Sequence, residues 1–179
     1  MRPASPFELA NHDVFVITSA HQGREGGQVA TWVMPGSLIP DQPRVVAVLS
    51  PMNATYELIR DSRRFALSLL ADEQLSLLPH FGLTSGRDID KLDGVAIRRT
   101  KSGLAVLEGC CGFAECQVAH ALDIGDRVVC VADVVEQEVD PDRRPLRTRQ
   151  AFERLPAEVV AALREKYLRD GERDRQLRR

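Results

Sequence analysis

Hydroxyl, amide and cationic side chains recur in the loops that follow the apolar segments of this 179-residue chain. Such a mixture binds phosphate, because hydroxyls, the free N–H groups of a helix N-terminus and one or two cations all donate to phosphate oxygens. Individually, Ser, Thr and Asn in loops are most often turn formers. Together they indicate a phosphorylated ligand. The set comprises Thr31, Ser37, Ser50, Asn53, Thr55, Ser85, Arg87 and Lys91.

The sequence lacks the short motifs of several common enzyme classes. It contains no GxGxxG, no GxxxxGK, no HExxH and no GxSxG. The four histidines stand in four different segments without the spacing of metal ligands. The acidic loop 88–94 begins like a calcium loop but has no Glu at the twelfth position. Neither hydrolytic nor metal-dependent chemistry is therefore predicted, and no catalytic residue or metal ligand is assigned.

Composition narrows the class of protein. The chain is 44% hydrophobic, which suffices for one domain with a packed core. Its 24 basic and 26 acidic residues give a net charge of −2, which argues against a nucleic-acid-binding protein. No run approaches the roughly 20 apolar residues of a membrane helix, the first residues lack the apolar core of a signal peptide, and the four cysteines form no CxxC pair. We expect a cytoplasmic protein without a membrane partner, whose cysteines are buried and reduced.

Alternation of apolar segments with turn residues predicts a mainly β fold with short helices. A loop at 23–27 joins the first two strands as a hairpin. A helix is expected after Asn53, which is suited to cap it, and a second short helix over 73–81 follows Asp72. The polar loop 82–93 comes next. The expected strands are 14–20, 28–34, 44–50, 65–70, 95–100, 112–121 and 126–139.

The last predicted strand is apolar on both faces. Val128 and Cys130 point to one side, while Val129 and Val131 point to the other. Because strands with two apolar faces are covered on both, this pattern predicts a barrel wall with a packed interior. A helix or a second subunit would cover the outer face.

The end of the chain predicts a helix from Gln150 that restarts at Pro156, since Pro suits a first helical turn. Its last sixteen residues hold seven basic and four acidic side chains. Two interpretations stay open for this segment. It is either a solvated, fraying tail or an arm that wraps a partner subunit.

An ordered series of segments adds a family resemblance. Residues 27–40 (GQVATWVMPGSLIP) are similar to a segment of the flavin reductase-like, FMN-binding split-barrel family. Segments 44–55, 80–91 and 125–127 follow in the order typical of that family. The resemblance spans about residues 10–148.

The resemblance implies a six-stranded antiparallel split β-barrel of Greek-key type over residues 1–148, with a C-terminal helical extension over 149–179. It also implies a homodimer with FMN at the subunit interface. Ala30, Thr31 and Trp32 would line the flavin edge and phosphate, although Trp32 could equally be barrel core. The other implied cofactor-binding residues are Ser50, Asn53 and Thr55 at the phosphate or ribityl chain, Ser85, Arg87 and Lys91 over the phosphate end, and Ser37 and Arg127.

The activity implied by the resemblance is NAD(P)H-dependent flavin reduction, in which hydride passes to flavin N5 and the cofactor supplies the chemistry. FMN is the expected flavin, with FAD as the alternative, and a partner monooxygenase or another acceptor would receive the reduced flavin or the electrons. Two departures bear on this expectation. Arg127 stands where the family often has His, so it either pairs with a dinucleotide phosphate or marks a lost NAD(P)H site, and Val29 replaces a common Thr.

Two alternative functions stay open. The first is an FMN-binding electron-transfer or redox module without its own NAD(P)H reductase activity. The second is a cofactor-free dimeric barrel that acts through protein contacts, with the C-terminal helix as its docking surface.

Overall fold

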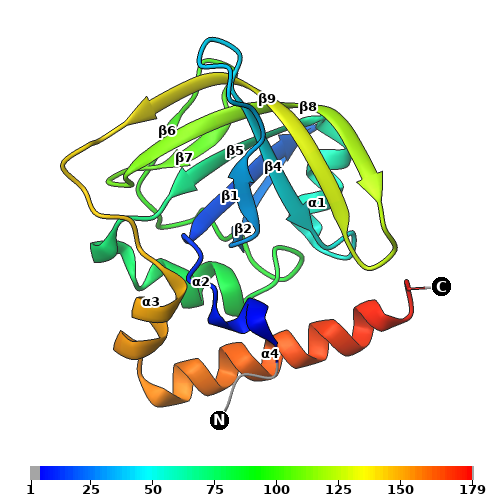
Figure 1. The fold of residues 1–179 in the computed structure, drawn as a ribbon, viewed down its shortest axis with the longest axis vertical. Helices are drawn as coiled ribbons and strands as arrows, with labels where there is room; N and C mark the ends of the chain where they lie inside the picture. The colour runs from blue at the N-terminus through cyan, green and yellow to red at the C-terminus, as the bar shows by residue number, and fades with distance from the viewer. Residues whose placement is uncertain (1–4, 179) are drawn as a thin grey trace.

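The computed structural model describes residues 5–178 and shows a curled antiparallel sheet with several helices gathered at one end (Figure 1). The strands are β1 (Phe15–His21), β2 (Arg24–Ala30), β3 (Val33–Pro35), β4 (Arg44–Leu49), β5 (Arg64–Leu69), β6 (Ile97–Arg99), β7 (Ala105–Leu107), β8 (Gly112–Asp123) and β9 (Val128–Val139). The α-helices are α1 (Ala54–Ser62), α2 (Leu77–Leu83), α3 (Thr148–Arg154) and α4 (Ala157–Arg175), and the short 3-10 helices are Pro6–Leu9 and Asp72–Gln74.

The main sheet has seven strands in the order β2-β1-β5-β8-β9-β4-β3, all antiparallel, and β6 pairs with β7 in a separate ribbon. The predicted mainly β, split-barrel fold is thus confirmed, with seven strands in the main sheet instead of six. The sheet curls around a core in which Ile17, Leu49, Phe65, Val118 and Cys130 are buried. Burial of this apolar surface is the main term that holds the barrel closed.

The expected strand 28–34 is wrong in one respect, because the chain breaks it at Thr31 and Trp32. β2 ends at Ala30 on one edge of the sheet, where it pairs with β1, and β3 begins at Val33 on the opposite edge, where it pairs with β4. One straight strand cannot reach both edges. The first 50 residues therefore hold four strands instead of three, and the break leaves Thr31 and Trp32 at the end of the barrel.

The β1–β2 hairpin turns at Gln22 and Gly23, whose φ angles are 49° and 76°, so the turn is tighter than the predicted loop 23–27. Two central residues with positive φ match the twist of antiparallel strands. Gly27 lies inside β2, where an added Cβ would stand 3.0 Å from Cε1 of Phe81. The missing side chain therefore lets α2 pack closely against β2.

The second predicted helix is also wrong in its bounds. Asp72 begins a single 3-10 turn, Asp72–Gln74, and α2 starts only at Leu77. Pro79 explains the shift, since proline has no N–H and is tolerated in a helix only in the first turn. Gln74 Oε1 accepts a hydrogen bond from the backbone N–H of Ala71 at 3.0 Å and so closes the preceding turn.

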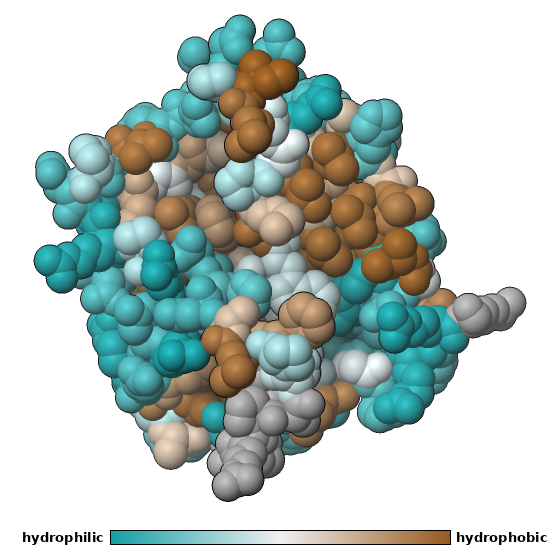
Figure 2. Space-filling view, viewed as in Figure 1, coloured by the Kyte–Doolittle hydropathy of each residue, from teal (hydrophilic) through white to brown (hydrophobic). Residues whose placement is uncertain are grey.

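β9 shows the predicted two-sided apolar pattern, but this chain covers only one side fully. Val128, Cys130 and Ala132 are buried in the core. Val135 and Val139 are 55% and 73% exposed, so the single chain leaves part of the outer face uncovered, and its cover by a second subunit stays a prediction. Figure 2 shows apolar side chains gathered over the sheet and at the projecting loop between β3 and β4.

All four cysteines are buried and free, as predicted. Burial raises the pKa of Cys116 to about 12 and that of Cys130 to about 11, so these thiols stay protonated at neutral pH and act as small apolar groups. Among residues 5–178, no helix is long and apolar enough to cross a membrane.

The C-terminal segment packs on the barrel of its own chain. α4 crosses the end of the barrel, from α2 to the turn between β8 and β9 (Figure 1). At that turn an added Cβ on Gly125 would lie 2.8 Å from the carbonyl oxygen of Leu177. Val160 and Asp174 are the buried residues of α4, so this helix is anchored on its own barrel and is not a free tail. The alternative of an arm on a partner subunit stays a prediction.

Candidate functional site

Two adjacent cavities lie between α4 and the end of the barrel. The first, here called the α2 cavity, has a volume of about 260 Å³ and lies beside α2 and the N-terminus of α1. The second, here called the Trp32 cavity, has a volume of about 210 Å³ and lies beside the break between β2 and β3. The two cavities share six lining residues: Gln28, Val29, Asn53, Tyr167, Asp170 and Arg173.

The fold brings ten of the eleven predicted cofactor-binding residues to these cavities. The α2 cavity is lined by Asn53, Thr55, Ser85, Arg87 and Lys91. The Trp32 cavity is lined by Ala30, Thr31, Trp32, Ser50, Asn53 and Arg127. Ser37 lies apart, in the loop between β3 and β4, where its Oγ accepts a hydrogen bond from the N–H of Ile39 at 3.0 Å. That contact makes Ser37 a turn former.

The N-terminus of α1 faces the α2 cavity through Asn53, Ala54 and Thr55. The backbone carbonyl of Asn53 accepts from the N–H of Tyr56 at 2.9 Å, which places Asn53 at the N-cap position, but its side chain makes no capping hydrogen bond within the described residues. The first N–H groups of a helix have no partner within it and carry partial positive charge. This end of the α2 cavity therefore favours an anion.

Lys91 brings a buried cation to the same cavity. It is only 5% exposed, although the sequence places it in a polar loop, and its Nζ donates to the carbonyl oxygen of Phe81 at 2.9 Å. Burial, and to a lesser degree the nearby ammonium of Lys166, lowers the pKa of Lys91 to about 8. An ammonium has three donors, so Lys91 can bind an anion while it holds Phe81.

Gln28 is a lining residue that the sequence analysis missed. It lies in β2, is buried and borders both cavities. Among residues 5–178, its Oε1 is the one buried side-chain polar atom without a hydrogen-bond partner. Leaving a buried acceptor unpaired costs about 1–3 kcal/mol, so this oxygen is suited to accept from a ligand. The available signal was a polar side chain at an inward position of a strand, two residues before the buried Ala30.

Arg87 and Arg127, the predicted cations nearest the rim, are each engaged by the protein. Arg87 pairs with Glu57 of α1 and donates to the carbonyl oxygen of Met52 at 3.1 Å. The guanidinium carbon of Arg127 stands 5.6 Å from the ring centre of Trp32, within cation–π range. Its Nη1 also donates to Oδ2 of Asp174 in α4 at 2.6 Å.

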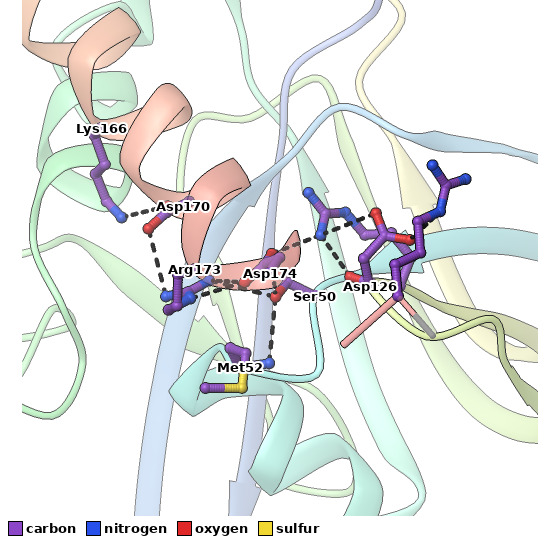
Figure 3. Close-up of polar contacts among 9 residues, drawn as sticks. Ser50, Met52, Asp126, Lys166, Asp170, Arg173 and Asp174 are labelled. Carbon is purple, nitrogen blue, oxygen red and sulfur yellow. Dashed lines mark hydrogen bonds and ion pairs between the residues drawn. The ribbon is translucent and has the colours of Figure 1, made fainter. Parts of the chain in front are cut away.

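Asp174 is the centre of a buried polar cluster (Figure 3). Its Oδ2 accepts from Ser50 Oγ at 2.9 Å as well as from Arg127, and its Oδ1 accepts from Arg173 Nε at 2.8 Å. Although burial alone would raise the pKa of Asp174, the hydrogen bonds from Arg173, Ser50 and Arg127 hold it below its ordinary value. Asp174 is therefore a carboxylate at neutral pH.

α4 adds lining residues that the sequence analysis did not anticipate: Leu163, Lys166, Tyr167, Asp170, Arg173 and Asp174. Lys166 Nζ and Asp170 Oδ2 form an ion pair at 2.7 Å between residues one helical turn apart. Asp170 Oδ1 also lies 3.4 Å from Arg173 Nη1. Such i,i+4 pairs are common on exposed helices. No local pattern distinguished them from a solvated face.

Comparisons with known proteins give the family context of this geometry. Residues 8–155 match the model of the flavin reductase like domain. The chain is 29% identical over 130 residues to a high molecular weight rubredoxin of Moorella thermoacetica, covering 72% of this chain but only 56% of that protein. It is 27% identical over 142 residues to a ferric-chelate reductase (NAD(P)H) of Archaeoglobus fulgidus, covering 78% and 83% of the two chains.

A third relative is the reductase component of a 4-nitrophenol 4-monooxygenase/4-nitrocatechol 2-monooxygenase of Rhodococcus opacus, 31% identical over 125 residues, with 70% of this chain and 64% of that protein covered. Among solved structures, nitrilotriacetate monooxygenase component B of Mycobacterium thermoresistibile superposes with a TM-score of 0.68 at 26% identity, covering 76% and 73% of the chains. An FMN-binding protein of Thermus thermophilus gives 0.70 at 24% identity, covering 78% of each chain.

The matched region contains every strand of the sheet and every barrel residue that lines the two cavities, whereas α4 lies beyond it. The chain belongs to the flavin reductase-like domain family.

Proposed function

We propose that this protein is an FMN-binding, NAD(P)H-dependent flavin reductase. The observation that carries the proposal is the convergence of predicted phosphate donors from β4, α1 and the loop after α2 on two adjoining cavities. Family membership supports the same function, and the names of the Archaeoglobus and Rhodococcus relatives describe reductases. FMN is proposed ahead of FAD, and NADH and NADPH are both candidate co-substrates.

The residues of the α2 cavity fit the phosphate end of a flavin mononucleotide. Lys91, Arg87 and the N-terminus of α1 would hold the phosphate through charge-assisted hydrogen bonds, with Thr55 and Ser85 as hydroxyl donors. Gln28 Oε1, which has no partner among residues 5–178, would accept from a polar group of the same ligand.

The Trp32 cavity fits the ring end less completely. Trp32 offers an apolar face and is 44% exposed, so it is available to a stacked ring. Ser50 and Arg127, however, already hold Asp174. A bound flavin supplies the atom that accepts the hydride, and this chain would hold and orient it while α4 limits the access of water.

A homodimer is part of the proposal. Apolar side chains stay exposed along β9, at the break after β2 and in the loop between β3 and β4 (Figure 2). They are Trp32, Met34, Leu38, Ile39, Val135 and Val139. Light scattering is expected to give a dimer. The substitution Val135→Asp should shift it to monomer, whereas Phe7→Asp, at an exposed apolar residue outside the sheet, should not. A monomeric parent protein would contradict the dimer.

We also propose a monooxygenase as the partner that consumes the reduced flavin. The support is that the Rhodococcus relative is named as the reductase component of a monooxygenase. A cytoplasmic location stays a prediction of the sequence.

A flavin-binding module without reductase activity is the second candidate. The observation that favours it is Arg127, which replaces a common family His and is occupied by Asp174. The deciding experiment is to purify the protein, record its flavin absorption spectrum and titrate it anaerobically with NADH and with NADPH. Bleaching of the flavin band supports the reductase. A flavin band that neither nucleotide bleaches supports the module, and no flavin binding at all would contradict both.

A further inference from the structure

α4 lies beyond the segment that matches the family, yet it covers both cavities. Tyr167, Asp170 and Arg173 belong to the wall that the cavities share. Each cavity alone is smaller than the roughly 300 Å³ at the lower end of small-molecule sites.

The contact that holds α4 over this cleft is made by the carboxylate of Asp174, which receives hydrogen bonds as a bound anion would. Asp174 is 1% exposed, and its two oxygens accept from Ser50, Arg127 and Arg173 at 2.6–2.9 Å. Hydroxyl and guanidinium donors bind carboxylates and phosphates alike. Ser50 and Arg127 are also two of the residues that the family resemblance assigns to a phosphate-bearing ligand.

The rest of the distal half of α4 is held weakly. In the proximal half, Val160 is buried and Leu163 packs on the apolar cluster of α2 and α3. From Arg164 to Arg175 Asp174 is the one buried side chain, while Tyr167 and Leu168 are each 67% exposed. Little apolar surface therefore opposes release of this half once the carboxylate loses its partners.

We propose that Asp174 is an internal anion that closes the nucleotide cleft, and that FMN, with its phosphate in the α2 cavity, opens the cleft when polar groups of its ribityl chain and ring take over Ser50 and Arg127. The proposal rests on the proposed flavin-binding function. The phosphate in the α2 cavity and the Asp174 carboxylate in the adjoining cavity repel each other, and this repulsion is strong in a site with little water. The charges facing Asp174 are Arg173 on its own helix and Arg127 in the turn before β9, and an oxygen of Asp126 lies 3.8 Å from Nη1 of Arg127.

The test compares Asp174→Ala with Glu172→Ala, an exposed acid of the same helix that pairs with Arg175. FMN affinity is measured by quenching of flavin fluorescence in the full-length chains. Asp174→Ala should bind FMN on the order of tenfold more tightly than the parent protein, a typical coupling between linked sites, and Glu172→Ala should be unchanged. Equal or weaker FMN binding by Asp174→Ala would overturn the proposal and leave Asp174 only the role of holding α4 on the barrel.

Hydrogen exchange on the unmodified chain gives a second, independent readout. Saturating FMN should speed amide exchange over residues 168–178, because these residues leave the barrel. Unchanged or slower exchange there would overturn the proposal even if the variant misfolds.

Inorganic phosphate separates failure of this proposal from failure of the proposed function. If neither chain binds FMN, the flavin function fails, and phosphate decides the role of Asp174. Tighter phosphate binding by Asp174→Ala would sustain the internal anion, whereas equal binding would overturn it. If both chains bind FMN equally, the function stands and the internal anion fails.

Discussion

The two cavities under α4 are built from the same kinds of residue but differ in how those residues are engaged. In the α2 cavity, Lys91 has spare donors, and Gln28, in the wall shared with the Trp32 cavity, has an acceptor without a partner among residues 5–178. In the Trp32 cavity, Ser50 and Arg127 hold a carboxylate from α4. The barrel therefore assembles the donors, while the helix beyond the family domain determines which of them a ligand reaches first.

The largest expected effect comes from removing donors of the α2 cavity. The double substitution Thr55→Ala and Arg87→Ala should weaken FMN binding by roughly 3 kcal/mol, about a hundredfold, because hydrogen bonds to charged groups contribute about 1.5–3 kcal/mol each and neighbouring losses are not fully additive. Fluorescence titration measures the change, with circular dichroism to verify folding.

Ser37→Ala is the matched control for that variant, because Ser37 carries a hydroxyl of the predicted set but lies outside both cavities. Its FMN affinity should equal that of the parent protein. If the double variant also binds like the parent, the α2 cavity is not the phosphate site.

The next effect is a pH dependence that only the α2 cavity should impose. The pKa of Lys91, lowered by burial and by Lys166, is about 8, so its positive charge is lost as the pH rises from 7 to 9. FMN affinity should then fall by up to about tenfold. Riboflavin, which lacks the phosphate, should show no such fall, and neither should FMN with Lys91→Met.

The lowered pKa of Lys91 also affects the stability of the fold, which should increase with pH where FMN affinity decreases. Because the pKa of Lys91 in the folded chain lies below its ordinary value of 10.5, the unfolded chain binds more protons between about pH 8 and 10.5. This residue therefore contributes stability that increases with pH in that window.

A pH-independent FMN affinity in the parent protein would contradict the preceding prediction and remove Lys91 from the phosphate site.

The smallest effect concerns the side-chain oxygen of Gln28, which has no hydrogen-bond partner in the described part of the chain. Gln28→Met keeps the side-chain length and removes the buried acceptor, so the free energy of unfolding should rise by about 1 kcal/mol while FMN affinity falls. Urea titration and flavin fluorescence measure the two quantities. A variant that is less stable but binds FMN normally would make Gln28 a structural residue.

Much of the barrel was predictable because its signals are local. Segment 65–70 and the helix after Asn53 follow from side-chain alternation and helical spacing, and they fold as β5 and α1. Pro79 and the break at Thr31 caused the errors, since the start of α2 depends on a missing N–H and the break depends on which edge of the sheet each strand joins.

The candidate site was predictable only in its barrel half. Its barrel residues stand in loops at strand ends, where hydroxyls and cations carry a signal. Asp174 has no such signal, because its burial depends on Ser50 and Arg127, which lie 124 and 47 residues away in sequence. Contacts of this kind arise from tertiary packing and produce no periodic pattern in the sequence.

The most direct test of the account is a crystal structure of the full chain with FMN. It should place the phosphate in the α2 cavity, in contact with Lys91 and Thr55, with the Asp174 carboxylate withdrawn from Ser50 and Arg127. Flavin bound elsewhere, or bound in the cleft with Asp174 still on both partners, would contradict the account.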